Sequence, residues 1–182
     1  MQHTEQHIRT LLQKCERGEQ SAQLEIYKRY YRAMYNTALR ILNNSFDAED
    51  MMQESFLIAF TKLSTFKGEV TFGSWLKRIV INKCLTQLKK NKRFEEVKLE
   101  VVASNNTEEN QNYSNVATEV VLKKISELKD NYRVALTLHL IEGYDHEEIS
   151  EIMQISNQNS RTTISRAKEK LRKIVLSEIT LN

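Results

Sequence analysis

Residues 154–173 read QISNQNSRTTISRAKEKLRK, a stretch that combines helical apolar spacing with an uneven distribution of polar side chains. On a helical wheel Ile164, Ala167, Leu171 and the following Ile174 share one face, at steps of three, four and three residues. The leading half of the stretch has few apolar residues, and the trailing half carries five of its six Lys and Arg side chains. We therefore expect a helix that packs on the protein through one face and leaves the other in solvent.

A second helix is expected immediately before this one. The segment HEEISEIM (residues 146–153) follows Asp145 and carries Glu148, so that the two acidic residues have the spacing of a capping box. Residues 154–156 form a short connection, and Ser156 is placed to cap the next helix. Two helices joined by about three residues predict a helix-turn-helix, whose second helix enters the major groove of DNA.

The solvent-facing side of the second helix carries residue types that bind DNA. Arg pairs with guanine and Gln with adenine, whereas Lys and Arg also bind phosphates and position the helix. An exposed helix end rich in Lys would be the alternative, and the short turn together with the basic tail favours DNA. The expected contacts are Gln158, Arg161, Thr162, Ser165, Arg166, Lys168 and Arg172.

Composition predicts an all-α protein. The chain has 182 residues, 40% of them hydrophobic, with four glycines and no proline, which leaves few breaks for many short strands. It has no run of about 18 apolar residues, and its start, MQHTEQHIRT, lacks the apolar region of a signal peptide, so we expect a soluble cytoplasmic protein without membrane insertion. Cys15 and Cys84 are expected to be buried thiols.

Charge is distributed unevenly along the chain. The net charge is +7 over residues 1–93, −8 over residues 94–160 and +4 over residues 161–182. Residues 94–118 are polar, acidic and without periodicity, which predicts a flexible linker between helical domains at residues 1–93 and 119–182. Two basic zones indicate two contact surfaces for a polyanion, although scattered solvated faces would give a similar count.

The apolar spacing predicts four helices in the N-terminal domain and two before the helix-turn-helix. Ser21 and Asp47 are the expected N-caps of the second and third helices, and Gly18 closes the first. The expected helices cover residues 4–17, 21–44, 48–66, 74–93, 119–128 and 131–143.

The fourth expected helix has a basic polar stripe. Between Lys77 and Arg93 lie seven Lys or Arg residues and no acidic one, and Trp75 precedes the stripe on the same side. Such a stripe suits a single strand, because Lys and Arg hold phosphates while aromatic rings stack on bases; Trp75 alone would more often be a core residue. The stripe consists of Arg78, Asn82, Thr86, Lys89 and Arg93.

Residues 46–93, FDAEDMMQESFLIAFTKLSTFKGEVTFGSWLKRIVINKCLTQLKKNKR, and the later GYDHEEISEIMQIS…SRAKEKLR resemble bacterial RNA polymerase sigma factors of the extracytoplasmic-function (ECF) group. The order and separation of the two segments also match, so the resemblance spans nearly the whole chain. Two positions differ from the family pattern: Gln154 stands where glycine is usual in the turn, and Ser160 where an inward apolar residue is common.

The resemblance implies that residues 1–93 are sigma region 2 and residues 119–182 are sigma region 4, which binds the upstream (minus-35) promoter element. Region 2 would dock on the clamp coiled coil of the largest core polymerase subunit. Taken alone, the acidic residues at this helix start would need no explanation beyond the helix dipole. The implied polymerase contacts are Asp47, Glu49, Asp50, Gln53, Glu54 and Phe56.

Region 2 would also bind the downstream (minus-10) promoter element and capture an unpaired base in a pocket formed by the loop at residues 66–73. The family commonly has an anti-sigma factor as a further partner. The implied minus-10 contacts are Phe66, Phe72, Trp75, Arg78, Asn82, Thr86, Lys89 and Arg93.

We therefore expect a sigma factor that binds core RNA polymerase, directs it to promoters and assists DNA opening. The sequence has no phosphate-binding glycine loop, nucleophile elbow or metal-ligand spacing, so we expect no catalytic residue, metal or cofactor. The alternatives are an autonomous helix-turn-helix regulator, which usually needs a dimer, and a regulatory protein that only sequesters polymerase and needs no basic stripe.

Overall fold

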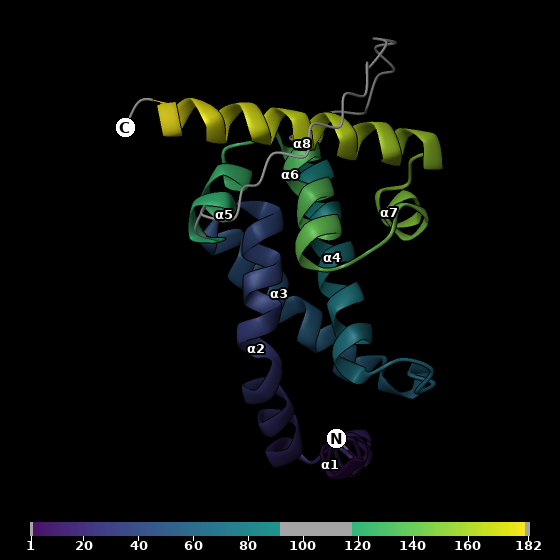
Figure 1. Cartoon of the computed structure of the whole chain (residues 1–182). Coiled ribbons are helices and arrows are strands. Elements are labelled where there is room, and N and C mark those ends of the chain that lie inside the picture. The colour runs from purple at the N-terminus through teal and green to yellow at the C-terminus, as the bar shows by residue number, and fades with distance from the viewer. Residues whose placement is uncertain (1, 92–117, 181–182) are drawn as a thin grey trace. The chain divides into compact units, whose positions relative to one another are not determined.

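The computed structural model describes residues 2–91 and 118–180, and all regular structure in this part of the chain is helical (Figure 1). The expected all-α fold is confirmed. The chain divides into two compact units, Met1–Asn91 and Lys92–Asn182. Nearly all of the expected linker, and Arg93, lie outside the described residues. None of the described helices is long and apolar enough to cross a bilayer.

The first unit is a bundle in which α2, α3 and α4 pack on one another and α1 packs on α2. Its core contains Ile26 and Ile41 of α2, Met52 of α3 and Leu76 and Val80 of α4, all at most 2% exposed. The elements are α1 (Gln2–Glu16), α2 (Gln20–Leu42), α3 (Ser45–Thr61), a short 3-10 turn η1 (Leu63–Thr65) and α4 (Phe72–Lys90).

The start of α3 differs from the sequence-based expectation. Asn44, not Asp47, is the N-cap, because its side-chain oxygen accepts from the backbone N–H groups of Phe46 and Asp47, at 2.9 and 3.1 Å. Asn43 ends α2 in the left-handed conformation, with φ of 52°, so the next helix begins almost at once. The assignment of Asp47 was wrong because Asn caps a helix as well as Asp does.

Two further helix starts also differ. α2 begins at Gln20 with Glu19 at the N-cap position, so Ser21 lies inside the first turn and the expected cap was wrong. α4 begins at Phe72, two residues earlier than expected, because Thr71 caps it by accepting from the Ser74 N–H at 3.2 Å.

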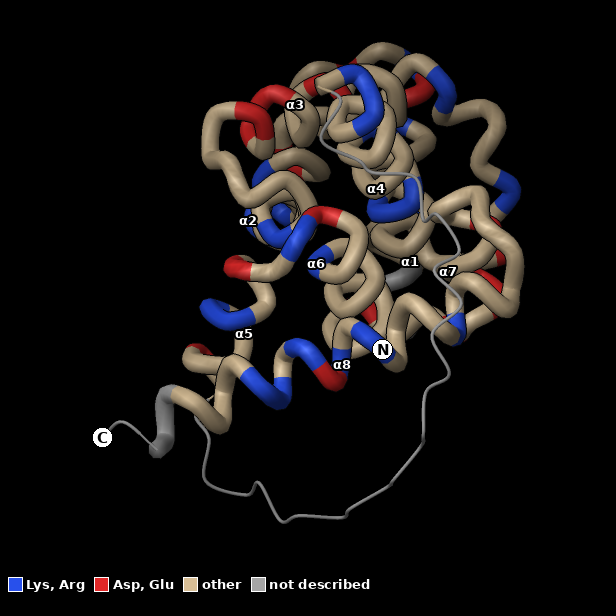
Figure 2. The backbone as a smooth tube through the Cα atoms, turned by 90° about the horizontal axis from the view of Figure 1, so that it is seen from above, with Lys and Arg blue, Asp and Glu red and all other residues tan. Residues whose placement is uncertain are grey.

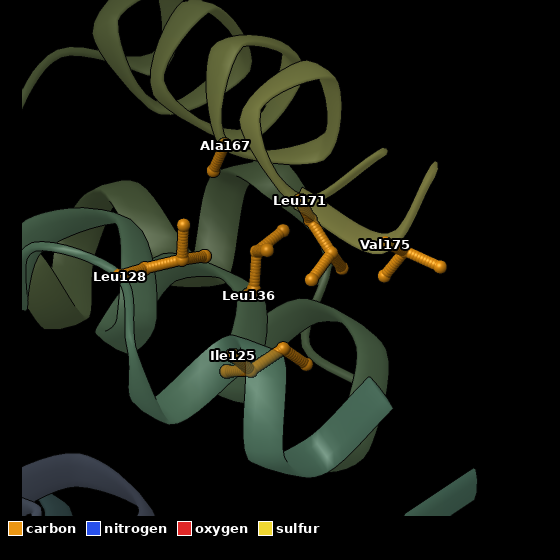
Figure 3. Close-up of a cluster of buried hydrophobic side chains, with 6 residues drawn as sticks. All are labelled: Ile125, Leu128, Leu136, Ala167, Leu171 and Val175. Atoms are coloured by element: carbon orange, nitrogen blue, oxygen red, sulfur yellow. The ribbon is translucent and has the colours of Figure 1, made fainter. Parts of the chain in front are cut away.

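The second unit is built around its long last helix, α8, which packs against α5, α6 and α7. Figure 3 shows its core side chains, which come from α5, the following turn, α6 and α8: Ile125, Leu128, Leu136, Ala167, Leu171 and Val175. The elements are α5 (Thr118–Ser126), α6 (Asp130–Leu136), a π-helical turn η2 (Thr137–Ile141), α7 (His146–Met153) and α8 (Asn157–Thr180).

The helix-turn-helix forms between α7 and α8. The expected capping box is confirmed: the Glu147 and Glu148 N–H groups donate to Asp145 Oδ1 at 2.8 Å, and Glu148 Oε2 accepts from the Asp145 N–H at 2.9 Å. Gln154 adopts the left-handed conformation, with φ of 58°, that glycine usually supplies after a helix. The turn therefore forms without glycine.

Within the described residues, two buried hydroxyl groups lie near the start of α8 and a third lies in η2. Ser160 and Thr163 of α8 and Thr137 of η2 are 0%, 2% and 0% exposed, and none of their hydroxyl oxygens has a hydrogen-bond partner within the described residues. An unpaired buried hydroxyl lowers stability by about 1–3 kcal/mol. The unpaired hydroxyls of Ser160 and Thr163 therefore weaken the packing of α8, the helix that carries the predicted minus-35 contacts.

The substitution Ser160→Ala should stabilise α8 by about 1 kcal/mol, because it removes an unsatisfied buried hydroxyl without creating a large cavity. Hydrogen exchange of α8 backbone amides measures this change directly. Ser165→Ala is the matched control, since Ser165 is exposed on the same helix and the change in helix propensity is identical. Equal stabilisation by both substitutions would contradict the prediction.

Candidate nucleic-acid interfaces

The outer face of α8 carries every residue that is expected to contact minus-35 DNA. Gln158, Arg161, Ser165, Lys168 and Arg172 are exposed, and Thr162 and Arg166 are half-buried. The opposite face is buried through Ile164, Ala167 and Leu171. Figure 2 marks the Lys and Arg positions of α8 in blue.

Two side-chain contacts order this outer face. Arg161 Nε donates to Asn157 Oδ1 at 3.0 Å, so the guanidinium group is held near the start of α8. Lys173 pairs with Glu169 at 2.7 Å, and this hydrogen bond lowers the pKa of the Glu169 carboxyl group. Both side chains of the second pair are exposed, so the pair adds little to stability.

The polar stripe of α4 is present on one exposed side of the helix. Asn82, Thr86 and Lys89 are exposed and Arg78 is half-buried, whereas Arg93 lies outside the described residues. The Thr86 hydroxyl donates to the Asn82 carbonyl oxygen at 2.8 Å, as is common for Thr in a helix. The structure thus groups four of the five stripe residues on one surface.

An aromatic cluster lies before and at the start of α4. The ring centroid of Phe72 is 5.5 Å from that of Tyr30, 5.7 Å from that of Phe66 and 5.7 Å from that of Trp75. Phe66 and Trp75 are half-buried and can present an edge or face to a ligand. Phe72 is 3% exposed and is the buried centre of the cluster, so in this structure it leaves almost no surface for a DNA contact.

A cavity of about 340 Å³ lies beside this cluster, where the resemblance places a base pocket. The loop contributes Phe66, Glu69 and Val70 to the wall, and α1 contributes Ile8 and Arg9. Its volume falls at the lower end of the range for small-ligand clefts, about 300–1,000 Å³. The part played by α1 was not expected, because nothing in the sequence signals which loop a helix will pack against.

The acidic side of α3 is arranged around its first turns. Glu49, Asp50 and Gln53 are exposed and Asp47 is half-buried, and Gln53 Nε2 donates to Glu49 Oε1 at 3.2 Å. Glu54 forms an ion pair with Lys83 of α4. Glu54, one of the expected polymerase contacts, is therefore paired with α4, the helix that carries the basic stripe.

Phe56 does not belong to this exposed face. It is 2% exposed, and its ring centroid lies 4.8 Å from that of Tyr27 and 6.1 Å from that of Phe60. In this structure Phe56 therefore offers a polymerase partner almost no surface. Phe56 lies four residues after Met52 and three before Ala59, so it shares their face of α3. Met52 and Ala59 are 2% and 0% exposed, which shows that this face is buried.

Two exposed apolar residues of α3 were missed by the sequence analysis. Phe46 is 85% exposed and Leu57 is 67% exposed. With Asp50 and Gln53 they follow steps of four, three and four residues, so the four side chains share one helix face. We call this face the α3 stripe: Asp50 and Gln53 lie in its middle, and the apolar Phe46 and Leu57 lie at its ends. A helical wheel of α3 would have indicated it.

Neither the cysteines nor the histidines form a reactive centre in the described residues. Cys15 and Cys84 are both free and buried, as expected, and burial raises the pKa of the Cys84 thiol to about 12. Within residues 2–91 and 118–180, no three His, Cys, Asp or Glu side chains are grouped so that they could hold a metal ion.

Comparisons with known proteins identify both units. Residues 26–94 match the family Sigma-70 region 2, and residues 118–171 match Sigma-70, region 4. The chain is 30% identical to the ECF RNA polymerase sigma factor SigW of Bacillus subtilis, over 93% of this chain and 97% of SigW. It is 27% identical to the ECF RNA polymerase sigma-E factor of Escherichia coli, over 87% of this chain and 89% of that protein.

A solved structure shares the fold. The sigma factor RpoE from Bartonella quintana, solved with the anti-sigma factor NepR, aligns with a TM-score of 0.57 and 21% identity, over 83% of this chain and 94% of that chain. Matches to both regions, in the same order and over nearly the full length of SigW, leave one conclusion. The chain belongs to the family of ECF RNA polymerase sigma factors.

Proposed function

We propose that this sigma factor uses three separate helix faces: the α3 stripe for core RNA polymerase, the α4 stripe for the opened minus-10 strand and the outer face of α8 for minus-35 DNA. The function of the family is to direct core polymerase to promoters. The observation that supports this division is that each helix buries one face in its own unit and exposes a face of different chemistry.

The outer face of α8 suits base readout in a major groove. Arg161 and Gln158 stand in the first turns of the second helix of a helix-turn-helix, where side chains reach base edges. Arg166, Lys168 and Arg172 follow and would hold phosphates on either side of the groove. Bidentate pairing of Arg with guanine distinguishes bases by about 1–3 kcal/mol.

The α4 stripe and the neighbouring cavity suit an unpaired strand. Arg78 and Lys89 would follow the backbone phosphates, while Asn82 supplies a donor and an acceptor between them. Trp75 and Phe66 are half-buried and their ring centroids are 5.3 Å apart, so packing holds the two rings in place and a base could stack on their exposed parts. We propose the cavity lined by the loop and α1 as the place of one flipped base.

The α3 stripe suits a protein partner. Phe46 and Leu57 expose apolar surface at both ends, and Asp50 and Gln53 supply charge and hydrogen bonding between them. Buried apolar contacts would supply most of the affinity, and the acidic side chains would orient the encounter. We assign this face to the clamp coiled coil of the largest polymerase subunit.

An anti-sigma factor is a further proposed partner. The RpoE of Bartonella quintana was solved with the anti-sigma factor NepR, and CnrH was solved with the cytosolic domain of CnrY. Such a partner could cover the same exposed apolar residues that we assign to polymerase, which would make the two kinds of binding exclusive.

The rival interpretation, an autonomous helix-turn-helix regulator, would use only the second unit. It leaves the α3 stripe and the match to Sigma-70 region 2 over residues 26–94 without a role. A protein that only sequesters polymerase would in turn leave the outer face of α8 without a role. We therefore favour promoter recognition by a polymerase-bound chain.

The substitution Leu57→Glu should weaken binding to core polymerase about tenfold, because it places a charge in the apolar part of the contact. Fluorescence anisotropy of the labelled chain, titrated with core polymerase, measures the change. Leu24→Glu is the matched control, since Leu24 is 52% exposed on α2 and lies off the stripe. If both variants bind core polymerase like the wild type, the assignment of α3 is wrong.

The substitution Arg161→Ala should lower run-off transcription about tenfold or more and relax selectivity at one base of the upstream element, because a bidentate pair is lost. Affinity for core polymerase should not change. Lys170→Ala removes an equal charge from an exposed position beside the proposed reading face and should have a smaller, sequence-independent effect. Equal losses in the two variants would indicate general electrostatics instead of base readout.

A further inference from the structure

Two histidines that the proposed contacts do not use stack beside the outer face of α8. His139 lies in the π-helical turn η2, and His146 is the first residue of α7. Their ring centroids are 5.1 Å apart, with the planes inclined by 24°. Lys168 Nζ lies 3.2 Å from His139 Nε2, so the pair is in contact with a predicted DNA-binding side chain.

The contacts of His139 indicate which ring nitrogen donates and which accepts. Its Nδ1 lies 3.2 Å from the carbonyl oxygen of Tyr144, which can only accept, so Nδ1 carries the hydrogen. The ammonium group of Lys168 can only donate, so Nε2 of His139 must accept. In this arrangement the lone pair of His139 Nε2 is taken by Lys168.

His146 lies in a cationic environment. Burial lowers the pKa of His146, and His139, Arg161 and Lys168 lower it further, whereas Asp145 raises it. Its Nδ1 atom is buried and has no hydrogen-bond partner within the described residues.

The carboxylates of Asp145 and Glu148, at the start of α7, have other partners. Asp145 accepts from the N–H groups of Glu147 and Glu148, and the Glu148 side chain accepts from the N–H of Asp145. The cluster therefore combines the side chains of His139, His146, Arg161 and Lys168 with carboxylates that already bind backbone N–H groups.

We propose that His139, His146 and Lys168 form a site for one backbone phosphate of the promoter, and that the histidine pair takes up one proton from solvent when this phosphate binds. The site rests on the proposed function, because it places α7 and α8 against DNA. Lys168 turns from His139 Nε2 to the phosphate, and His146 takes up the proton and becomes a second charged donor. The helix dipole at the start of α7 also favours an anion.

The pair takes up one proton and not two, because two imidazolium rings 5.1 Å apart repel each other. A bound phosphate favours the charged form, so it raises the pKa of His146 in the complex above that of the free protein. The complex then binds more protons than the free chain, and DNA affinity rises as the pH falls through this interval. Because binding is linked to the uptake of one proton, DNA affinity can rise by at most about tenfold for each pH unit.

The test uses the full chain and a fluorescent duplex that carries a promoter active in run-off transcription, with anisotropy measured from about pH 8 to about pH 5.5. Wild-type affinity should rise about three- to tenfold over this range, whereas the variant with both His139→Gln and His146→Gln should change less than twofold. His7→Gln is the control, since His7 pairs with Glu25 in the other unit, and it should behave like the wild type. Equal pH dependence in the wild type and the double variant would overturn the proposal.

A second measurement needs no substitution. In NMR spectra of the wild-type chain, addition of the duplex should raise the midpoint of the His146 titration by at least about half a pH unit. An unchanged midpoint in a DNA-saturated sample would also overturn the proposal.

Arg161→Ala separates this inference from the proposed function. If it weakens duplex binding while the histidine substitutions leave the pH dependence intact, only the phosphate site fails. If Arg161→Ala has no effect on binding or transcription, the proposed function of α8 fails with it.

Discussion

The burial of one face of each partner-binding helix fixes the opposite face as the surface that meets a partner. In α8, Ile164, Ala167 and Leu171 are at most 9% exposed, and a large aliphatic side chain buried in this way contributes about 1.5–3 kcal/mol. Turning the helix by one residue, about 100°, would expose these side chains and carry Arg161 toward the core. A buried, unpaired guanidinium group lowers stability by several kcal/mol. The apolar core therefore sets which side chains of α8 are exposed and available for the proposed DNA contacts.

The exposed faces add little to folding and so remain available for binding. Surface pairs such as Glu169 with Lys173 contribute little to stability, and salt screens them. The three faces also differ in chemistry. Those of α4 and α8 are basic, which gives salt-dependent attraction to phosphates, whereas the α3 stripe combines the acidic Asp50 with the apolar Phe46 and Leu57. Because the surfaces differ in chemistry, the basic faces favour a polyanion and the α3 stripe favours a protein, so neither partner competes for the other's surface.

The sequence predicts those features that depend on local periodicity and spacing. The all-α fold, the capping box at Asp145 and the two faces of α8 follow from steps of three and four residues and from short polar signals. Features that depend on packing between helices could not be read in this way. Phe56 and Phe72 are aromatic residues at the edges of polar stretches, and only the positions of Tyr27 and Tyr30 on a neighbouring helix show that they are buried. The contribution of α1 to the cavity has the same origin.

The central claim is that α4 and α8 hold separate segments of one promoter while the polymerase holds the chain. Hydroxyl-radical footprinting of open complexes tests it most directly. With wild-type protein we expect two protected segments; Arg161→Glu should remove only the upstream protection and Arg78→Glu only the downstream one, with affinity for core polymerase unchanged in both. If either charge reversal removes both protections together, or leaves both intact, the assignment of two independent DNA-binding surfaces is wrong.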